Sequence, residues 1–130
     1  MSHYDKNLDK NKANYVPLTP LTFLKRAKEI YPNYEALIYE DRKYSWDQVY
    51  KRTVKFASAL NKIGVKKGDT VSFLAFNTPE IFEGHYSVPM TGAVLNTINI
   101  RLDAKTISYI LDHSEAKVLV VDRQLHIEVK

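Results

Sequence analysis

Three short apolar runs, separated by segments of helical periodicity, constrain most strongly what this chain can fold into. The runs occupy residues 70–75, 94–98 and 117–121, and short continuous runs of this kind are typical of strands buried on both faces. The residues between them place apolar side chains at helical spacing. Strands that alternate with helices indicate βαβ crossovers, so the sequence predicts an α/β fold with a parallel sheet flanked by helices.

The N-terminal half predicts two helices and a small hairpin. The capping residue Thr19 and the proline after it begin the first helix, and Pro32 ends it. Residues 35–45 read as two short strands joined by a turn, which indicates a hairpin. Residues 45–48 match a capping box at the start of a long helix, and Gly64 is expected to close that helix as a C-cap.

The C-terminal half predicts two further helices. The first opens at residues 77–79, and Pro89 near its end is expected to kink it. Its expected inward side chains are Ile81, Phe82, Tyr86 and Val88. Asp103 is expected to cap the second helix, and the residues after Asp122 are expected to begin one more.

The chain length suits a single domain with a real core, preceded by a loose segment. Residues 1–16 are polar, rich in Lys and Asn and without periodicity, which predicts a flexible leader. The domain is expected to occupy residues 17–130. The pattern stops soon after the last strand, so the sequence is typical of the opening of a larger protein.

Composition excludes several classes of protein. Cysteine is absent, which excludes disulfides, thiolate metal sites and cysteine nucleophiles and is compatible with a reducing cytosol. The first residues are polar and lack the apolar core of a secretory signal, so a cytoplasmic location is predicted. No apolar run approaches the roughly 20 residues that a membrane span requires, so no span is expected.

Positive charge is spread over the chain rather than gathered in one patch. The formal net charge is +4, and residues such as Lys51, Arg52 and Lys55 are interpreted as the solvated face of a helix. The alternative is a general attraction of a polyanionic ligand such as a nucleotide or coenzyme A. The acidic pair Glu80 and Glu83 is interpreted as residues of a helix start.

The side chains that most often carry chemistry form no recognisable pattern. The histidines at positions 3, 85, 113 and 126 share no close spacing, so no metal site is expected and His85 and His113 are interpreted as ordinary helix residues. The glycines are isolated and form no phosphate-binding loop. The nine tyrosines fall mostly where packing explains them, so base stacking and a nucleic-acid partner are not expected.

Polar residues follow the second apolar run at a position where ligands often bind. Asn99 and Arg101 come directly after residues 94–98, at the expected carboxyl end of that strand. In open α/β sheets, ligands bind in the crevice outside the carboxyl ends of the strands. The sequence therefore predicts that this stretch borders a binding site, with Asn99 forming a turn.

Two segments resemble core motifs of the adenylate-forming superfamily, which includes acyl-CoA synthetases, 4-coumarate-CoA ligases and the adenylation domains of peptide synthetases. Residues 44–49, Tyr-Ser-Trp-Asp-Gln-Val, resemble the first core motif, and residues 92–99, Gly-Ala-Val-Leu-Asn-Thr-Ile-Asn, resemble the second. Thr97 stands where many relatives have proline. Residues 14–24, 99–104 and 113–117 are similar to segments of the fatty-acyl-CoA synthetase type.

The resemblance implies a two-step reaction for the whole enzyme. A carboxylate attacks the α-phosphate of magnesium-bound ATP to give an acyl adenylate, and the thiol of coenzyme A then displaces AMP. On this reading, residues 17–130 are the truncated N-terminal subdomain of an AMP-binding domain that activates a carboxylic acid of the fatty-acid type. Its partners would be the remainder of the enzyme chain and the small carboxylic acid.

The resemblance also implies which functional residues to expect here. The Ser/Thr/Gly-rich phosphate loop with its lysine, the aromatic-Thr-Glu segment and the C-terminal lysine of such enzymes would all lie after residue 130. This chain is therefore expected to hold no catalytic residue, no metal ligand and no bound cofactor, and to be inactive alone.

Arg101 matches a position that lies near the nucleotide part of coenzyme A in some members of the family, and a guanidinium suits phosphate oxygens. Two alternatives stay open. Arg101 could instead pair locally near Asp103, and the chain could be a stand-alone, non-catalytic α/β module that binds a partner or nucleotide. An uncovered last strand disfavours that module, because an exposed sheet edge invites association.

Overall fold

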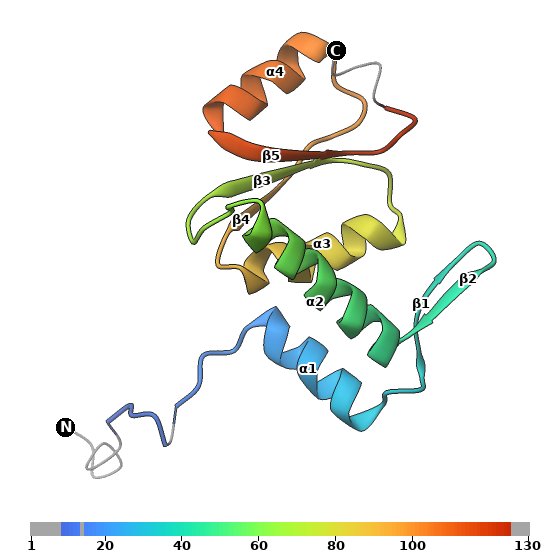
Figure 1. Ribbon diagram of the computed structural model, residues 1–130, viewed down its shortest axis with the longest axis vertical. Helices are drawn as coiled ribbons and strands as arrows, with labels where there is room; N and C mark the ends of the chain where they lie inside the picture. The colour runs from blue at the N-terminus through green and yellow to red at the C-terminus, as the bar shows by residue number, and fades with distance from the viewer. Residues whose placement is uncertain (1–8, 14, 126–130) are drawn as a thin grey trace, which may run out of the picture.

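The computed structural model describes residues 9–13 and 15–125 and shows the expected mixed α/β architecture (Figure 1). The helices are α1 (Pro20–Ile30), α2 (Trp46–Lys62), α3 (Pro79–Met90) and α4 (Ala104–His113). The strands are β1 (Glu35–Tyr39), β2 (Arg42–Ser45), β3 (Thr70–Leu74), β4 (Val94–Thr97) and β5 (Ala116–Val121). The described part of the expected leader contains no helix or strand. The helix expected after Asp122 falls largely on residues 126–130, which lie outside the described residues.

A parallel sheet with strand order β4-β3-β5 forms the centre of the fold, and β1 and β2 form a separate antiparallel hairpin. Both sheets confirm the predicted fold class. The prediction of three buried strands is wrong for two of them, because among the described residues β4 and β5 lie at the edges of the sheet and are exposed or half-buried. Val94 in β4 is 55% exposed, and most of β5 is half-buried.

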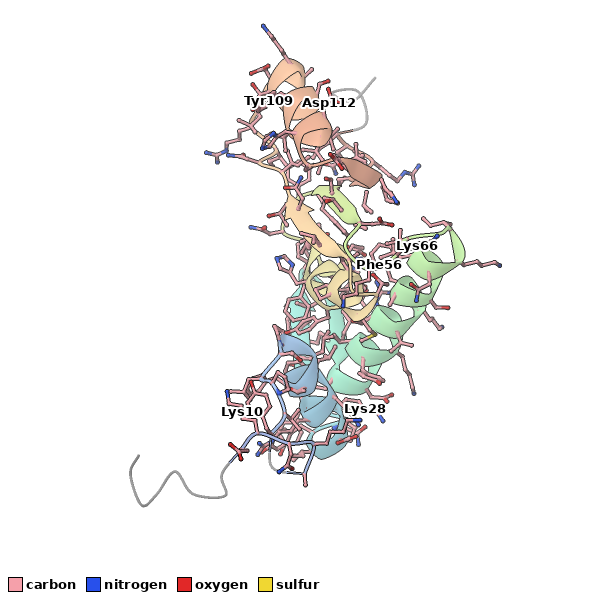
Figure 2. All side chains as sticks on the ribbon, turned by 90° about the vertical axis from the view of Figure 1, so that its left-hand side faces the viewer. Lys10, Lys28, Phe56, Lys66, Tyr109 and Asp112 are labelled. Carbon is pink, nitrogen blue, oxygen red and sulfur yellow. The ribbon has the colours of Figure 1, made fainter. Side chains whose placement is uncertain are left out.

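Two apolar clusters cover the opposite faces of this sheet. Val71 and Phe73 of β3 pack with residues of α2 and α3 on one face, whereas Leu74 packs with Ile107 of α4 on the other. Phe56 lies between α2 and the sheet (Figure 2), with its ring centroid 6.0 Å from that of Phe73. Side chains alternate along a strand, so β3 supplies both clusters and fixes α3 and α4 on opposite sides (Figure 1).

Local capping bonds explain where the long helix α2 begins and ends. Its first turn holds the complete capping box predicted for residues 45–48. At its end, Gly64 adopts a φ of +94°, and the N–H of Val65 donates to the carbonyl of Leu60 at 3.0 Å. These contacts form a Schellman cap and confirm both predicted ends of the helix.

The inward face of α3 differs from the prediction. Ile81, Phe82 and Tyr86 are only half-buried, and the fully buried side of the helix carries Pro79, Glu83, Gly84, Ser87 and, as predicted, Val88. The reason is the close approach of the helix to Phe73: a Cβ on Gly84 would lie 2.7 Å from the ring. A residue without a side chain is therefore needed where α3 meets the ring of Phe73, whereas Phe82 and Tyr86 line a pocket with residues of the hairpin.

Candidate functional site

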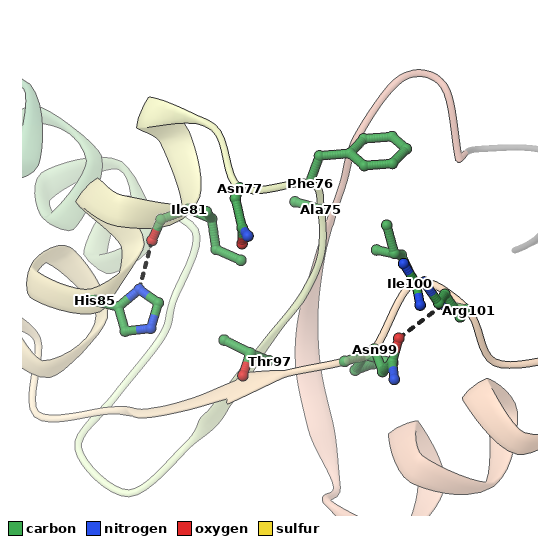
Figure 3. Close-up of a pocket in the computed structure, with 10 residues that line it drawn as sticks. Ala75, Phe76, Asn77, Ile81, His85, Thr97, Asn99, Ile100 and Arg101 are labelled. Atoms are coloured by element: carbon green, nitrogen blue, oxygen red, sulfur yellow. Dashed lines mark hydrogen bonds between the residues drawn. The ribbon is translucent and has the colours of Figure 1, made fainter. Parts of the chain in front are cut away.

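A pocket of about 540 Å³ lies at the carboxyl ends of β3 and β4 (Figure 3). β3 leads into α3 on one face of the sheet, whereas the neighbouring β4 leads into α4 on the other face. The connections diverge, so the sheet opens between the two strand ends, and such switch points are where open α/β sheets bind ligands. The lining residues are Ala75, Phe76, Asn77, Ile81, His85, Thr97, Ile98, Asn99, Ile100 and Arg101.

The loop after β4 forms one wall of this pocket through an alternation of apolar and polar residues. Ile98, Ile100 and Leu102 pack into the cluster beneath α4. The residues between them, Asn99 and Arg101, are exposed and line the pocket (Figure 3). The expectation that these two polar residues lie at the carboxyl edge of the sheet is therefore confirmed in geometry.

Hydrogen bonds define the backbone of that loop. The N–H of Arg101 donates to Oδ1 of Asn99 at 3.0 Å, so Asn99 forms the predicted turn. Asp103 accepts from the N–H of Thr106 at 3.0 Å and from its hydroxyl at 2.8 Å. The Thr106 N–H, followed by its hydroxyl, holds the pKa of Asp103 below its usual value.

The cap on α4 disfavours the alternative in which Arg101 pairs locally near Asp103. Both carboxylate oxygens of Asp103 are engaged with Thr106. Within the described part of the chain, the structure shows no ion pair between Arg101 and an acidic side chain. The guanidinium is thus available to an anionic ligand.

The opposite wall of the pocket comes from α3 and includes His85, which was interpreted from the sequence as an ordinary helix residue. His85 is exposed on the pocket side, and its Nδ1 lies 2.8 Å from the carbonyl oxygen of Ile81 (Figure 3). A hydrogen bond at Nδ1 leaves Nε2, on the other side of the ring, for a ligand. Its place one turn after Ile81, in the helix that follows β3, brings it to the wall of the pocket.

A second, mainly apolar pocket of about 480 Å³ lies between the hairpin and α3. Leu37, Ile38 and Tyr39 of β1 form one side of it, and it shares Asn77, Ile81 and His85 with the first pocket. The first turns of α3 therefore separate a polar pocket at the sheet edge from an apolar pocket beneath the hairpin.

Ion pairs behind the pocket correct two interpretations of charged residues. Glu83 is buried and paired with Arg52 of α2, so it is not a helix-start residue and Arg52 is not part of a fully solvated face. Glu80 lies in the first turn of α3 as expected and pairs with Arg42 of the hairpin at 3.0 Å. These pairs connect α2, α3 and the hairpin around the start of α3.

The part of the chain that the structure describes contains neither a cluster of metal-binding side chains nor a helix suited to span a membrane. No group of three or more His, Asp or Glu side chains among the described residues is arranged to hold a metal ion. None of the helices within residues 9–13 and 15–125 is long and apolar enough to cross a membrane.

Comparisons with known proteins extend this picture. The model of a family described as AMP-binding enzyme matches residues 24–130. Butyrate–CoA ligase AAE11, peroxisomal, of Arabidopsis thaliana is 54% identical over 116 residues, which cover 89% of this chain and 20% of that protein. Trans-cinnamate:CoA ligase, peroxisomal, of Petunia hybrida is 55% identical over 115 residues, covering 88% and 20%.

Solved structures show the same likeness. The crystal structure of the anthranilate CoA ligase AuaEII in complex with anthranoyl-AMP superposes with a TM-score of 0.81 at 27% identity, covering 84% of this chain and 21% of that one. The chain therefore spans about a fifth of the length of the relatives that it matches.

Proposed function

Because this chain belongs to the family of AMP-binding enzymes, we propose that it forms the N-terminal part of an ATP-dependent acyl-CoA ligase. The observation that carries the proposal is the identity of 54% with a butyrate–CoA ligase over most of this chain. In the proposed reaction, a carboxylate oxygen attacks the α-phosphate of ATP and pyrophosphate leaves. The coenzyme A thiol then attacks the acyl carbonyl, and AMP leaves.

The proposed substrate is a small carboxylic acid. The relatives are named for butyrate, trans-cinnamate and anthranilate, so their acids include one aliphatic and two aromatic compounds. A fatty acid, as the sequence resemblance implies, fits the aliphatic member of this set. The carboxylic acids used to test the proposal must therefore include both aliphatic and aromatic compounds.

Within the whole enzyme, the proposed contribution of this chain is a binding one. Arg101 stands at the pocket mouth without an ion-pair partner among the described residues, and its planar guanidinium can bind a phosphate group through two parallel hydrogen bonds. We assign it to a phosphate of the nucleotide part of coenzyme A. Magnesium, bound with ATP, would neutralise phosphate charge elsewhere in the enzyme.

The coding sequence that follows Lys130 gives a first test of this proposal. A continuation that encodes a Ser/Thr/Gly-rich loop with a lysine supports it. The longer product, incubated with ATP, magnesium, coenzyme A and butyrate, cinnamate or anthranilate, should then yield acyl-CoA detectable by mass spectrometry. A reading frame that stops after 130 residues while the short product accumulates would contradict the proposal and favour a stand-alone binding module.

The compartment is a further part of the proposal. Composition favours the cytoplasm, whereas the names of the butyrate and cinnamate ligases give a peroxisomal location. A fluorescent fusion of the longer product, imaged beside a peroxisomal marker, separates these locations. Diffuse fluorescence supports the cytoplasmic proposal, and punctate overlap with the marker contradicts it.

A further inference from the structure

The side chain of Asn99 accepts a hydrogen bond within the turn from which Arg101 projects. We propose that Asn99 is a positioning residue: its side-chain carbonyl holds the backbone of Arg101 so that the guanidinium meets a phosphate group of coenzyme A. This inference rests on the proposed function, because the ligand is the one assigned there to Arg101.

The packing of the loop shows why one hydrogen bond has this effect. Ile98, Ile100 and Leu102 anchor the inner side of the loop in the cluster beneath α4. On the outer side, the bond from the Arg101 N–H to Oδ1 of Asn99, 3.0 Å long, closes the turn. An amide side chain that accepts from the backbone two residues later is a well-known stabiliser of such turns.

The side chain of Arg101 depends on this backbone turn for its direction. No acidic residue in the described part of the chain holds the guanidinium, and a long flexible side chain loses rotamer entropy when a ligand orders it. The nearby carboxylate of Asp103 is engaged with Thr106. The turn at Asn99 therefore determines where the Arg101 side chain leaves the backbone, and the phosphate of the ligand becomes the ion-pair partner of the guanidinium.

Variants of the longer ligase separate positioning from general stability. Asn99→Ala removes the acceptor, and it should raise the KM for coenzyme A about fivefold while the kcat at saturating coenzyme A stays within about twofold. Asn99→Ser keeps a neutral acceptor for the same N–H and should bring the KM back to within about threefold of the wild type. Arg101→Gln should raise the KM at least as much as Asn99→Ala.

A second readout does not depend on activity. Hydrogen exchange of a peptide covering residues 99–102, measured by mass spectrometry, should be about fivefold faster in Asn99→Ala, because one hydrogen bond contributes roughly 1 kcal/mol. The matched control is Asn11→Ala, which removes a similar bond of 2.9 Å from the N–H of Ala13. This control should leave both the KM and the exchange of residues 99–102 unchanged.

The outcomes distinguish the inference from the function on which it rests. An unchanged KM in Asn99→Ala, together with a raised KM in Arg101→Gln, overturns the positioning role and leaves Arg101 in place. An unchanged KM in Arg101→Gln overturns both the role of Arg101 and the inference about Asn99. A wild-type enzyme that forms no acyl-CoA from any acid overturns the proposed function itself.

Discussion

Arg52 on α2 and Glu83 on α3 form a bidentate ion pair between the two helices. Nη2 of Arg52 lies 3.1 Å from Oε2 of Glu83, and Nε pairs with Oε1. Glu83 is 5% exposed, and the guanidinium also lies over the ring of Tyr44, 4.9 Å from its centroid. The pair therefore joins α2, α3 and the hairpin in one contact.

Removal of the arginine from this pair should destabilise the fold. Arg52→Met leaves the Glu83 carboxylate buried without a partner, which costs about 3 kcal/mol when both groups are buried. Because the side chain of Arg52 is 39% exposed, we expect about 2 kcal/mol, measured by urea unfolding. The matched control is Lys51→Met, whose side chain is 67% exposed beside Asp47 and should contribute under about 0.5 kcal/mol. Equal effects of the two variants would contradict this account.

Gly84→Ala should destabilise the fold by about 1–3 kcal/mol, because the added methyl group would overlap the ring of Phe73. In a chain that already carries Phe73→Leu, the loss of stability caused by Gly84→Ala should be smaller, because the ring that the methyl group would overlap is gone. The contrasting variant is Gly64→Ala, which has open space around its Cβ but a φ of +94°. Its cost of about 1 kcal/mol comes from the backbone, so Phe73→Leu should not change it. Equal rescue of both variants would argue against a steric contact at Gly84.

Asp69 should contribute a part of the stability that acid removes. The ammonium of Lys117, 2.8 Å away, and then the N–H of Lys66 hold the pKa of Asp69 below its usual value. With a folded pKa below the unfolded value of about 3.9, this contribution is present at higher pH and is lost as the pH falls through the folded pKa. Between pH 6 and pH 3, the thermal midpoint of Asp69→Asn should therefore fall less than that of the wild type.

Lys117→Met gives the control for that experiment, because it removes the first cause of the lowered pKa. Its acid dependence should also be shallower than that of the wild type. An unaltered pH dependence in both variants would show that Asp69 titrates alike in the folded and unfolded chains.

The 130-residue chain should be marginally stable or self-associating. Within the described residues, neither β4 nor β5 pairs with a strand at its outer edge, and unpaired edges are templates for association. Light scattering after size exclusion should show a mass that rises with concentration. A monodisperse monomer with a sharp cooperative melt would contradict this prediction.

Features that depend on neighbours in the sequence were predictable, and features that depend on distant residues were not. The capping box at Ser45 and the cap at Asp103 each join residues three positions apart, so local pattern suffices. The burial of Glu83 depends on Arg52, which lies 31 residues away. The exposure of β4 follows from the strand order, which no local signal fixes.

The candidate site divides in the same way. The position of Arg101 at the end of a strand was predictable, because Arg101 follows the apolar run at residues 94–98. The position of His85 on the opposite wall was not predictable, because it depends on α3 lying at the same edge of the sheet as the loop that holds Arg101. The segments that form each wall can be recognised in the sequence, but only the tertiary fold shows that they face each other across one pocket.

ATP–pyrophosphate exchange tests the central claim most directly, because it reports adenylate formation without coenzyme A. The assay compares the 130-residue chain with the longer product of the same locus, each with a panel of aliphatic and aromatic carboxylic acids. The account predicts exchange by the longer product with at least one acid and none by the 130-residue chain. Clear exchange by the short chain alone, or none by the longer product with any acid, would contradict it.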